Sequence, residues 1–182
     1  MINEEQLYIV NYCHNNCTPL KNIMRLPKEA AFELATELAE KNKGSTAFCR
    51  FADFAVYYPE RLATDKILYE RFMALGGRPN NEHPLSFVLQ GSEYLNQWFD
   101  NGIVAKLPLV KIPSEKISFT LGDSMSTLKQ NGTIAMLSKT DLLEKISTYE
   151  GTLEEFMEEV RAKYGYIEVQ LWDDDYCNEG ES

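Results

Sequence analysis

The chain has 182 residues, with 28 acidic and 18 basic side chains and a formal net charge of −10. Apolar types make up 44% and charged types 25% of the sequence, a composition that excludes a largely disordered protein. No stretch approaches the ~18 apolar residues of a membrane-spanning helix, and the N-terminus lacks the basic and apolar regions of a secretion signal. We therefore expect a cytoplasmic protein without a membrane partner.

The first half of the chain predicts one strand and three helices. Residues 6–12 are rich in aromatic and β-branched types and indicate a strand, which Cys13-His14-Asn15-Asn16 ends as a turn. Helices are predicted over 27–42, over 46–57, and from Thr64 or Asp65 to Leu75. We expect Pro59 to separate the last two helices, because a proline lacks the backbone donor that a helix interior needs.

The second half predicts most of the sheet. Short strands are expected over 86–90, 103–110, 117–121, 133–137 and 166–172. The last of them alternates apolar and polar residues, so one of its faces should be buried. A helix is expected after Ser92, and the capping boxes Ser138-x-x-Asp141 and Thr152-x-x-Glu155 predict helices near 139–148 and 152–163.

Strands and helices do not alternate in a regular βαβ rhythm, which favours the α+β class. We expect a single domain over 1–172, with a small mixed or antiparallel sheet packed by several amphipathic helices. Residues 173–182 are predicted to form an acidic, disordered tail.

The charge is concentrated at one end of the chain. Residues 1–140 contain 15 acidic and 15 basic side chains, whereas 141–182 contain 13 acidic and three basic ones. This distribution disfavours direct nucleic-acid binding and favours a basic protein partner. The first hypothesis is therefore a non-catalytic interaction or regulatory protein, such as a nucleic-acid-mimicking inhibitor, which docks through its acidic face over 141–182. The candidate docking residues lie on one face of the helix over 152–163: Glu154, Glu155, Glu158 and Glu159.

The cysteines give little indication of chemistry. Four scattered cysteines are typical of a reducing compartment. Cys13-His14-x-x-Cys17 contains zinc-ligand types but lacks paired Cys-x-x-Cys halves, so we expect no metal site. A Cys13 or Cys17 nucleophile with His83 as its base remains an alternative. No dinucleotide or Walker motif is present, and we expect no cofactor.

A spacing of 3, 4 and 4 residues relates Arg50, Asp53, Tyr57 and Arg61, which would place them on one face of a continuous helix. An arginine there could bind a phosphate or carboxylate, with Tyr57 positioning the ligand. The alternative is a structural ion pair between Arg50 and Asp53.

The polar side of the last strand carries Glu168, Gln170 and Trp172. If this side lines a cleft, Glu168 is the best-placed acid in the chain; if it faces water, the three are ordinary exposed residues. Gly122-Asp123-Ser124 either presents backbone amides to an anion or begins a helix. The second hypothesis is therefore a small enzyme acting on a nucleotide or another anionic metabolite, which binds Arg50, Asp53, Arg61 and Gln170 and reacts beside Glu168, Tyr57 and His14.

A histidine shortly after the first strand and a glutamate on a late strand are similar to ADP-ribosyltransferase-fold proteins. In that family these residues hold the nicotinamide ribose of NAD and stabilise the developing cation, and the resemblance implies the same roles for His14 and Glu168. The sequence departs from the family pattern at both places. His14 lies in Cys-His-Asn-Asn rather than His-Gly-Thr or His-x-Thr, and Glu-x-Gln inverts the order of Gln/Glu-x-Glu.

Overall fold

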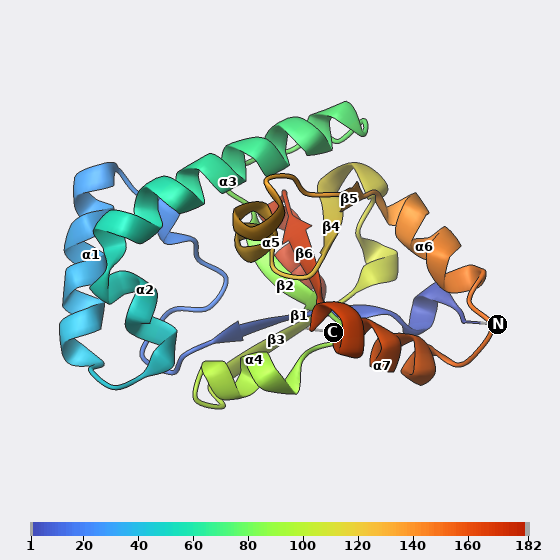
Figure 1. The fold of residues 1–182 in the computed structure, drawn as a ribbon, viewed down its shortest axis with the longest axis horizontal. Helices are drawn as coiled ribbons and strands as arrows, with labels where there is room; N and C mark the ends of the chain where they lie inside the picture. The colour runs from blue at the N-terminus through green and yellow to red at the C-terminus, as the bar shows by residue number, and fades with distance from the viewer. Residues whose placement is uncertain (1, 181–182) are drawn as a thin grey trace.

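A computed structural model describes residues 2–180 and contains one antiparallel sheet (Figure 1). The strand order is β3-β1-β2-β6-β4-β5. The strands are β1 (Tyr8–Cys13), β2 (Leu85–Leu89), β3 (Ile103–Pro108), β4 (Ile117–Leu121), β5 (Met136–Leu137) and β6 (Ile167–Leu171). The predicted α+β class with a single domain is confirmed.

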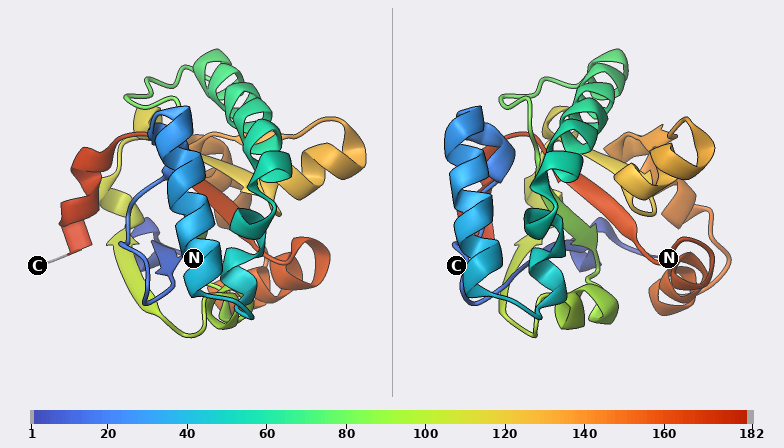
Figure 2. Two further views of the ribbon diagram at one scale, coloured as in Figure 1. Left: turned by 90° about the vertical axis from the view of Figure 1, so that its left-hand side faces the viewer. Right: turned by 60° about the vertical axis from the view of Figure 1, so that its left-hand side comes forward.

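The helices lie on both sides of this sheet. They are α1 (Lys28–Lys41), α2 (Cys49–Ala52), α3 (Phe54–Ala74), α4 (Glu93–Trp98), α5 (Ser124–Asn131), α6 (Lys139–Ser147) and α7 (Leu153–Tyr164). Both predicted capping boxes are present, at the start of α6 and of α7. Figure 2 shows α1 and α7 on opposite sides of the strands. No helix in the described part of the chain has the length and apolar character needed to cross a bilayer.

The main hydrophobic core fills the space between one face of the sheet and the helices α6 and α7. Ile167, Val169 and Leu171 of β6 are completely buried there, packed with apolar residues of both helices. The opposite face of β6 carries Glu168 and Gln170, and Trp172 follows directly after the strand; these three residues are buried as well. The prediction that only one face of this strand is buried is therefore wrong, because α3 and the segments around it cover the polar face.

The helix α3 corrects the expected position of a helix break. Pro59 lies inside α3, and the chain breaks instead at Asp53, between α2 and α3. Phe54 packs into an aromatic cluster with Phe48 and Phe51. At the other end of the helix, Phe72 packs in a separate cluster with Trp172. The free energy gained from these contacts at both ends of α3 outweighs the loss of the one backbone hydrogen bond that Pro59 cannot donate.

The predicted disordered tail also differs in the structure. Residues Asp174–Gly180 form the 3-10 helix η6, which lies against the edge strand β3 (Figure 2). Its first residue, Asp174, forms an ion pair with Arg25. The part of the tail over 181–182 lies outside the described residues.

Candidate functional site

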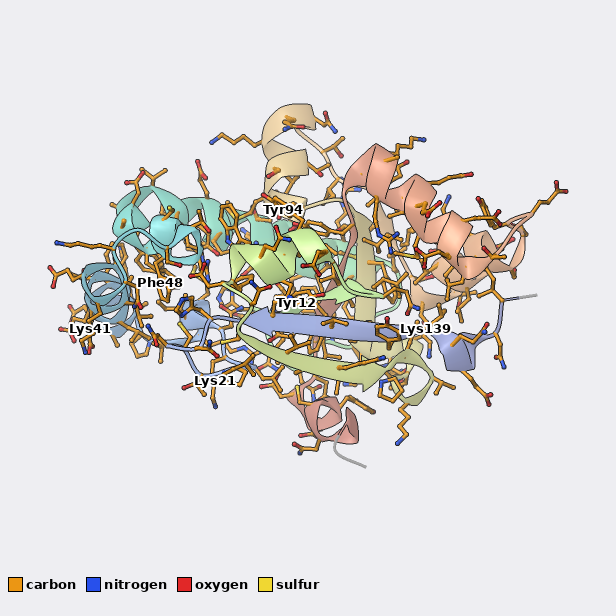
Figure 3. The ribbon with its side chains drawn as sticks, turned by 90° about the horizontal axis from the view of Figure 1, so that it is seen from below. Tyr12, Lys21, Lys41, Phe48, Tyr94 and Lys139 are labelled. Carbon is orange, nitrogen blue, oxygen red and sulfur yellow. The ribbon has the colours of Figure 1, made fainter. Side chains whose placement is uncertain are left out.

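A cavity of about 740 Å³ lies where α1, α2 and α3 meet the sheet. Its wall includes residues from β1, β2 and β6, the loop that follows β1, and the helices α2 and α3. The volume falls in the range of pockets that bind small organic molecules. Figure 3 shows Phe48, Tyr12 and Lys21, three of its lining residues, around the C-terminal end of β1, with Lys139 toward the other end.

The cavity exists because two neighbouring strands separate. β1 pairs with β2 only at Ile9 and Val10, although it continues to pair with β3 as far as Cys13. β2 in turn pairs with β6 from Leu85 to Val88. The Asn11 side chain spans the gap and donates a hydrogen bond from Nδ2 to the Ser86 carbonyl at 2.8 Å. The facing segments of both strands line the cavity.

Arg50 presents a cation to this cavity. Its guanidinium carbon lies 4.4 Å from the ring centroid of Phe51 and 5.8 Å from that of Phe99, and Nη1 donates to the Ala47 carbonyl. Among residues 2–180, no carboxylate lies within ion-pair distance of Arg50. Asp53, its predicted partner, is exposed and does not line the cavity. Ring stacking thus fixes the guanidinium while most of its donors remain available.

Arg61 forms the buried ion pair that the sequence analysis assigned to Arg50. Its Nε lies 2.8 Å from Asp65 Oδ1, and its Nη2 contacts the same oxygen. The other carboxylate oxygen, Oδ2, lies 2.7 Å from His83 Nδ1. Burial alone would lower the pKa of Arg61, but Asp65, Tyr57 and Glu168 raise it overall, so the guanidinium stays charged. Tyr57 lines the cavity near this pair.

Glu168 is a buried carboxyl group on the cavity wall, with 7% of its surface exposed. One oxygen, Oε2, is near three donors: Thr120 Oγ1 at 3.1 Å, the Ser124 amide at 3.1 Å and Gln170 Nε2 at 3.0 Å. The other oxygen, Oε1, has no hydrogen-bond partner within the described chain. Burial raises the pKa of Glu168 above its ordinary value, although Arg61 and the hydrogen bonds oppose this effect. The protonated form is thereby favoured.

A ladder of polar side chains between β4 and β6 holds Glu168 in place. Trp172 Nε1 donates to Ser118 Oγ at 2.9 Å, and Ser118 Oγ lies 2.8 Å from Gln170 Oε1. Gln170 Nε2 then donates to Glu168. Gln170 is not among the cavity-lining residues, so the structure gives this predicted ligand-binding residue a positioning role. In such a network every satisfied bond restricts the orientation of the next group.

The turn at Gly122-Asp123-Ser124 begins α5. Asp123 Oδ2 accepts the Ser126 amide at 3.1 Å, as an N-cap does. The Ser124 amide donates to Glu168 Oε2, so the group at this helix start is a carboxyl group of the protein itself. Ser124 Oγ is buried without a hydrogen-bond partner in the described structure.

His14 lines the cavity, but both of its ring nitrogens are occupied. The Asn16 amide donates to Nδ1 at 3.0 Å, which leaves the proton on Nε2, 3.0 Å from Asp100 Oδ2. The ring packs edge-on against Phe48. In this arrangement His14 shapes the wall and has no free nitrogen for proton transfer.

Cys13 and Cys17 also line the cavity as free thiols. Burial raises the pKa of Cys13 to about 11, and it raises the pKa of Cys17 as well. Both therefore remain thiols at neutral pH, the form that is not nucleophilic. His83, the base proposed for them, is bonded to Asp65 and is not among the lining residues. Within the described residues, no group of three or more His, Cys, Asp or Glu side chains is placed to hold a metal ion.

The cavity thus brings together His14, Arg50, Tyr57, Arg61 and Glu168. Asp65 and Arg25 are lining residues that the sequence analysis missed. The spacing of four residues between Arg61 and Asp65 could have identified Asp65, because residues four apart are neighbours on a helix. Arg25 and its partner Asp174 are 149 residues apart, and no local pattern relates them.

The predicted docking residues Glu154, Glu155, Glu158 and Glu159 are exposed on α7, away from the cavity. Several of them already have partners. Glu154 pairs with Arg161 at 3.1 Å, Glu155 closes the capping box with Thr152, and Glu159 accepts from Tyr149 at 2.7 Å. The Arg161 contact offsets one negative charge, and the other two contacts restrict the orientation of their carboxylates.

Comparison of the chain with protein-family models, curated proteins and solved structures finds no match. The similarity of His14 and Glu168 to the ADP-ribosyltransferase pattern therefore stands on those two positions alone.

Proposed function

We propose that the protein is a small enzyme that binds an organic anion in this cavity. The observation that carries the proposal is Arg50, a cation without a carboxylate partner in the described chain, in the same cavity as a buried acid with an open oxygen. Four basic and three acidic side chains line the cavity of a protein whose net charge is −10. A locally positive cavity in an acidic protein concentrates anions there.

The lining also supports a ligand with a planar ring, such as a nucleotide. Phe48, Phe51, Tyr57 and Phe99 line the cavity, and Phe51 and Phe99 lie beside Arg50. An anionic group at Arg50 and a ring beside these side chains would use both kinds of surface.

Glu168 would act as the acid of the reaction. Burial raises its pKa, so the carboxyl group keeps its proton to a higher pH than an exposed glutamate does, and Oε1 is the oxygen left free to donate it. The polar ladder fixes the carboxyl group, so little reorganisation is needed when a ligand binds. Tyr57 and Arg61 would position the ligand.

Binding is tested by a thermal-shift screen of nucleotides, NAD and sugar phosphates, followed by calorimetry. Arg50→Met keeps the apolar contact with Phe51 but loses the charge, so affinity should fall on the order of ten- to a hundred-fold. Arg71→Met, an exposed change on α3 outside the cavity, is the matched control. A flat screen, or equal losses in both variants, would contradict the proposal.

Catalysis is tested on the ligand that the screen identifies. Mass spectrometry should detect its conversion by the wild-type protein and not by Glu168→Gln, while calorimetry shows that this variant still binds it. A ligand recovered unchanged from the wild-type protein would contradict the catalytic part of the proposal.

The acidic face of α7 supports a second candidate function, docking on a basic protein. Its specific support is the exposure of Glu154, Glu155, Glu158 and Glu159 on one helix. Replacing all four by Gln should weaken capture of the partner at low salt. Unchanged capture would refute docking through this face.

A further inference from the structure

A second arginine of the cavity is occupied by a carboxylate of the protein. Arg25 is the last residue of the 3-10 helix η2 (Ile23–Arg25), and Asp174 is the first residue of η6. Nη1 of Arg25 lies 2.5 Å from Asp174 Oδ2, and Nη2 lies 3.0 Å from Oδ1. Both residues line the cavity. This two-bonded geometry is the one with which arginine binds a carboxylate or a phosphate group of a ligand.

The orientation of Arg25 does not depend on Asp174. Its Nε donates to the His83 carbonyl at 2.9 Å. The helix that carries it is anchored by Asn22, whose side chain accepts from the Met24 amide and donates to the Pro84 carbonyl. Without Asp174, the two outer nitrogens of Arg25 would therefore still point to the same place.

Asp174 is held less firmly than the arginine that it faces. Its side chain is 47% exposed, against 23% for Arg25. Because Asp174 is partly exposed, an anion from solution that makes the same two bonds to Arg25 can replace its carboxylate at small cost. Arg50, in the same cavity, has no carboxylate to exchange within the described structure. Besides Arg61, which is paired with the buried Asp65, the cavity thus contains two oriented guanidinium groups: Arg50 is open, and Arg25 is occupied by the exposed Asp174.

Building on the proposed function, we infer that the ligand carries two separate anionic groups, of which one binds Arg50 and the other takes the place of Asp174 on Arg25. Binding of the second group releases Asp174 and loosens η6 from β3. A ligand with one anionic group binds at Arg50 and leaves Asp174 in position. The cavity therefore selects ligands with two separate anionic groups, and its occupancy is transmitted to the C-terminal segment.

The inference is tested with a matched pair of nucleotides, AMP and adenosine 3′,5′-bisphosphate, by calorimetry on the full chain. The wild-type protein should bind the bisphosphate on the order of ten-fold more tightly. Asp174→Asn removes the internal competitor and should strengthen bisphosphate binding further, with AMP unchanged. Arg25→Met should reduce the bisphosphate affinity to that of AMP, and Asp175→Asn, an exposed change in the same segment, should alter neither.

Release of η6 gives an independent measurement. Cys177 lies in η6 and is half-buried, so the rate of its alkylation by iodoacetamide, followed by mass spectrometry, reports the position of this segment. In the wild-type protein the bisphosphate should raise that rate several-fold while AMP does not. The exposed Cys49 serves as the internal reference.

The outcomes separate this inference from the proposed function. The inference is overturned if the two nucleotides bind with equal affinity, and if this binding is lost in Arg50→Met but is unaffected by Asp174→Asn or Arg25→Met. That result leaves the proposed function standing. Cys177 alkylation that the bisphosphate leaves unchanged in the wild-type protein also overturns the inference. The inference is likewise overturned if neither nucleotide binds to the wild-type protein or to Asp174→Asn. Only a flat result across the wider ligand screen overturns the proposed function.

Discussion

Replacing Glu168 by glutamine should change the dependence of stability on pH in one defined direction. Glu168 is buried, and its pKa is raised above the ordinary value of 4.5 that it regains on unfolding. Between those two pKa values the folded protein holds a proton that the unfolded chain has lost. The free energy of unfolding therefore falls as pH rises through this window. The glutamine side chain does not titrate, so the variant lacks this loss.

The expected slope follows from the linkage relation. The difference in free energy of unfolding, variant minus wild type, should rise by about 1.4 kcal/mol per pH unit from roughly pH 4.5 upward. It should level off once the folded carboxyl group also ionises. The amide fits the site because its oxygen can accept the Ser124 amide in place of Oε2, while its nitrogen takes the open position of Oε1.

Urea denaturation of both proteins between pH 4 and pH 8, at intervals of half a unit, measures this difference directly. All other titrating groups are shared and cancel. Glu158→Gln, which removes an exposed carboxylate of α7, controls for the loss of one negative charge. A difference that stays flat across this range, or that falls with pH, would show that Glu168 is ionised in the folded protein and would refute its assignment as an acid.

Three further substitutions test the structure by urea denaturation. Trp172→Ala should cost about 3–5 kcal/mol, because the ring is fully buried and stacked on Phe72 at 5.3 Å; a cost below 1 kcal/mol would contradict this packing. Asp65→Asn should cost about 3–5 kcal/mol by leaving Arg61 buried without its carboxylate, and adding Arg61→Met should recover part of that loss. Thr152→Ala should cost about 1 kcal/mol through loss of the α7 cap, and an unchanged stability would argue against that cap.

Local patterns in the sequence were sufficient to predict most elements. The alternation over 166–172 identified β6, and the two capping boxes located the starts of α6 and α7 within one residue. Such signals depend on neighbouring residues alone. The position of the break between α2 and α3 was not predictable in this way, because the clusters that hold Phe54 and Phe72 at the two ends of α3 include residues distant in the sequence, such as Trp172.

The sequence was sufficient to predict several residues of the candidate site, but not which of them form ion pairs with one another. The spacing of Arg50, Tyr57 and Arg61 identified three lining residues, although the helix is broken at Asp53. The burial of Glu168 was not predictable, since an alternating strand with a polar face is most simply interpreted as half-exposed. Only the packing of α3 over that face determines that Glu168 is an enclosed acid.

The separation of β1 from β2 explains why this fold contains a cavity at all. If β1 and β2 paired along their whole length, the sheet beneath α3 would be continuous and the space that the gap opens would close. Each backbone hydrogen bond that is missing at the gap would have favoured this pairing. Asn11 replaces one of those bonds with its side chain, so the opening is partly compensated within the protein. Shortening this bridge with Asn11→Ala should therefore weaken the gap region without filling it. A ligand whose affinity for Asn11→Ala differs from its affinity for the wild-type protein would identify the gap as part of its binding site.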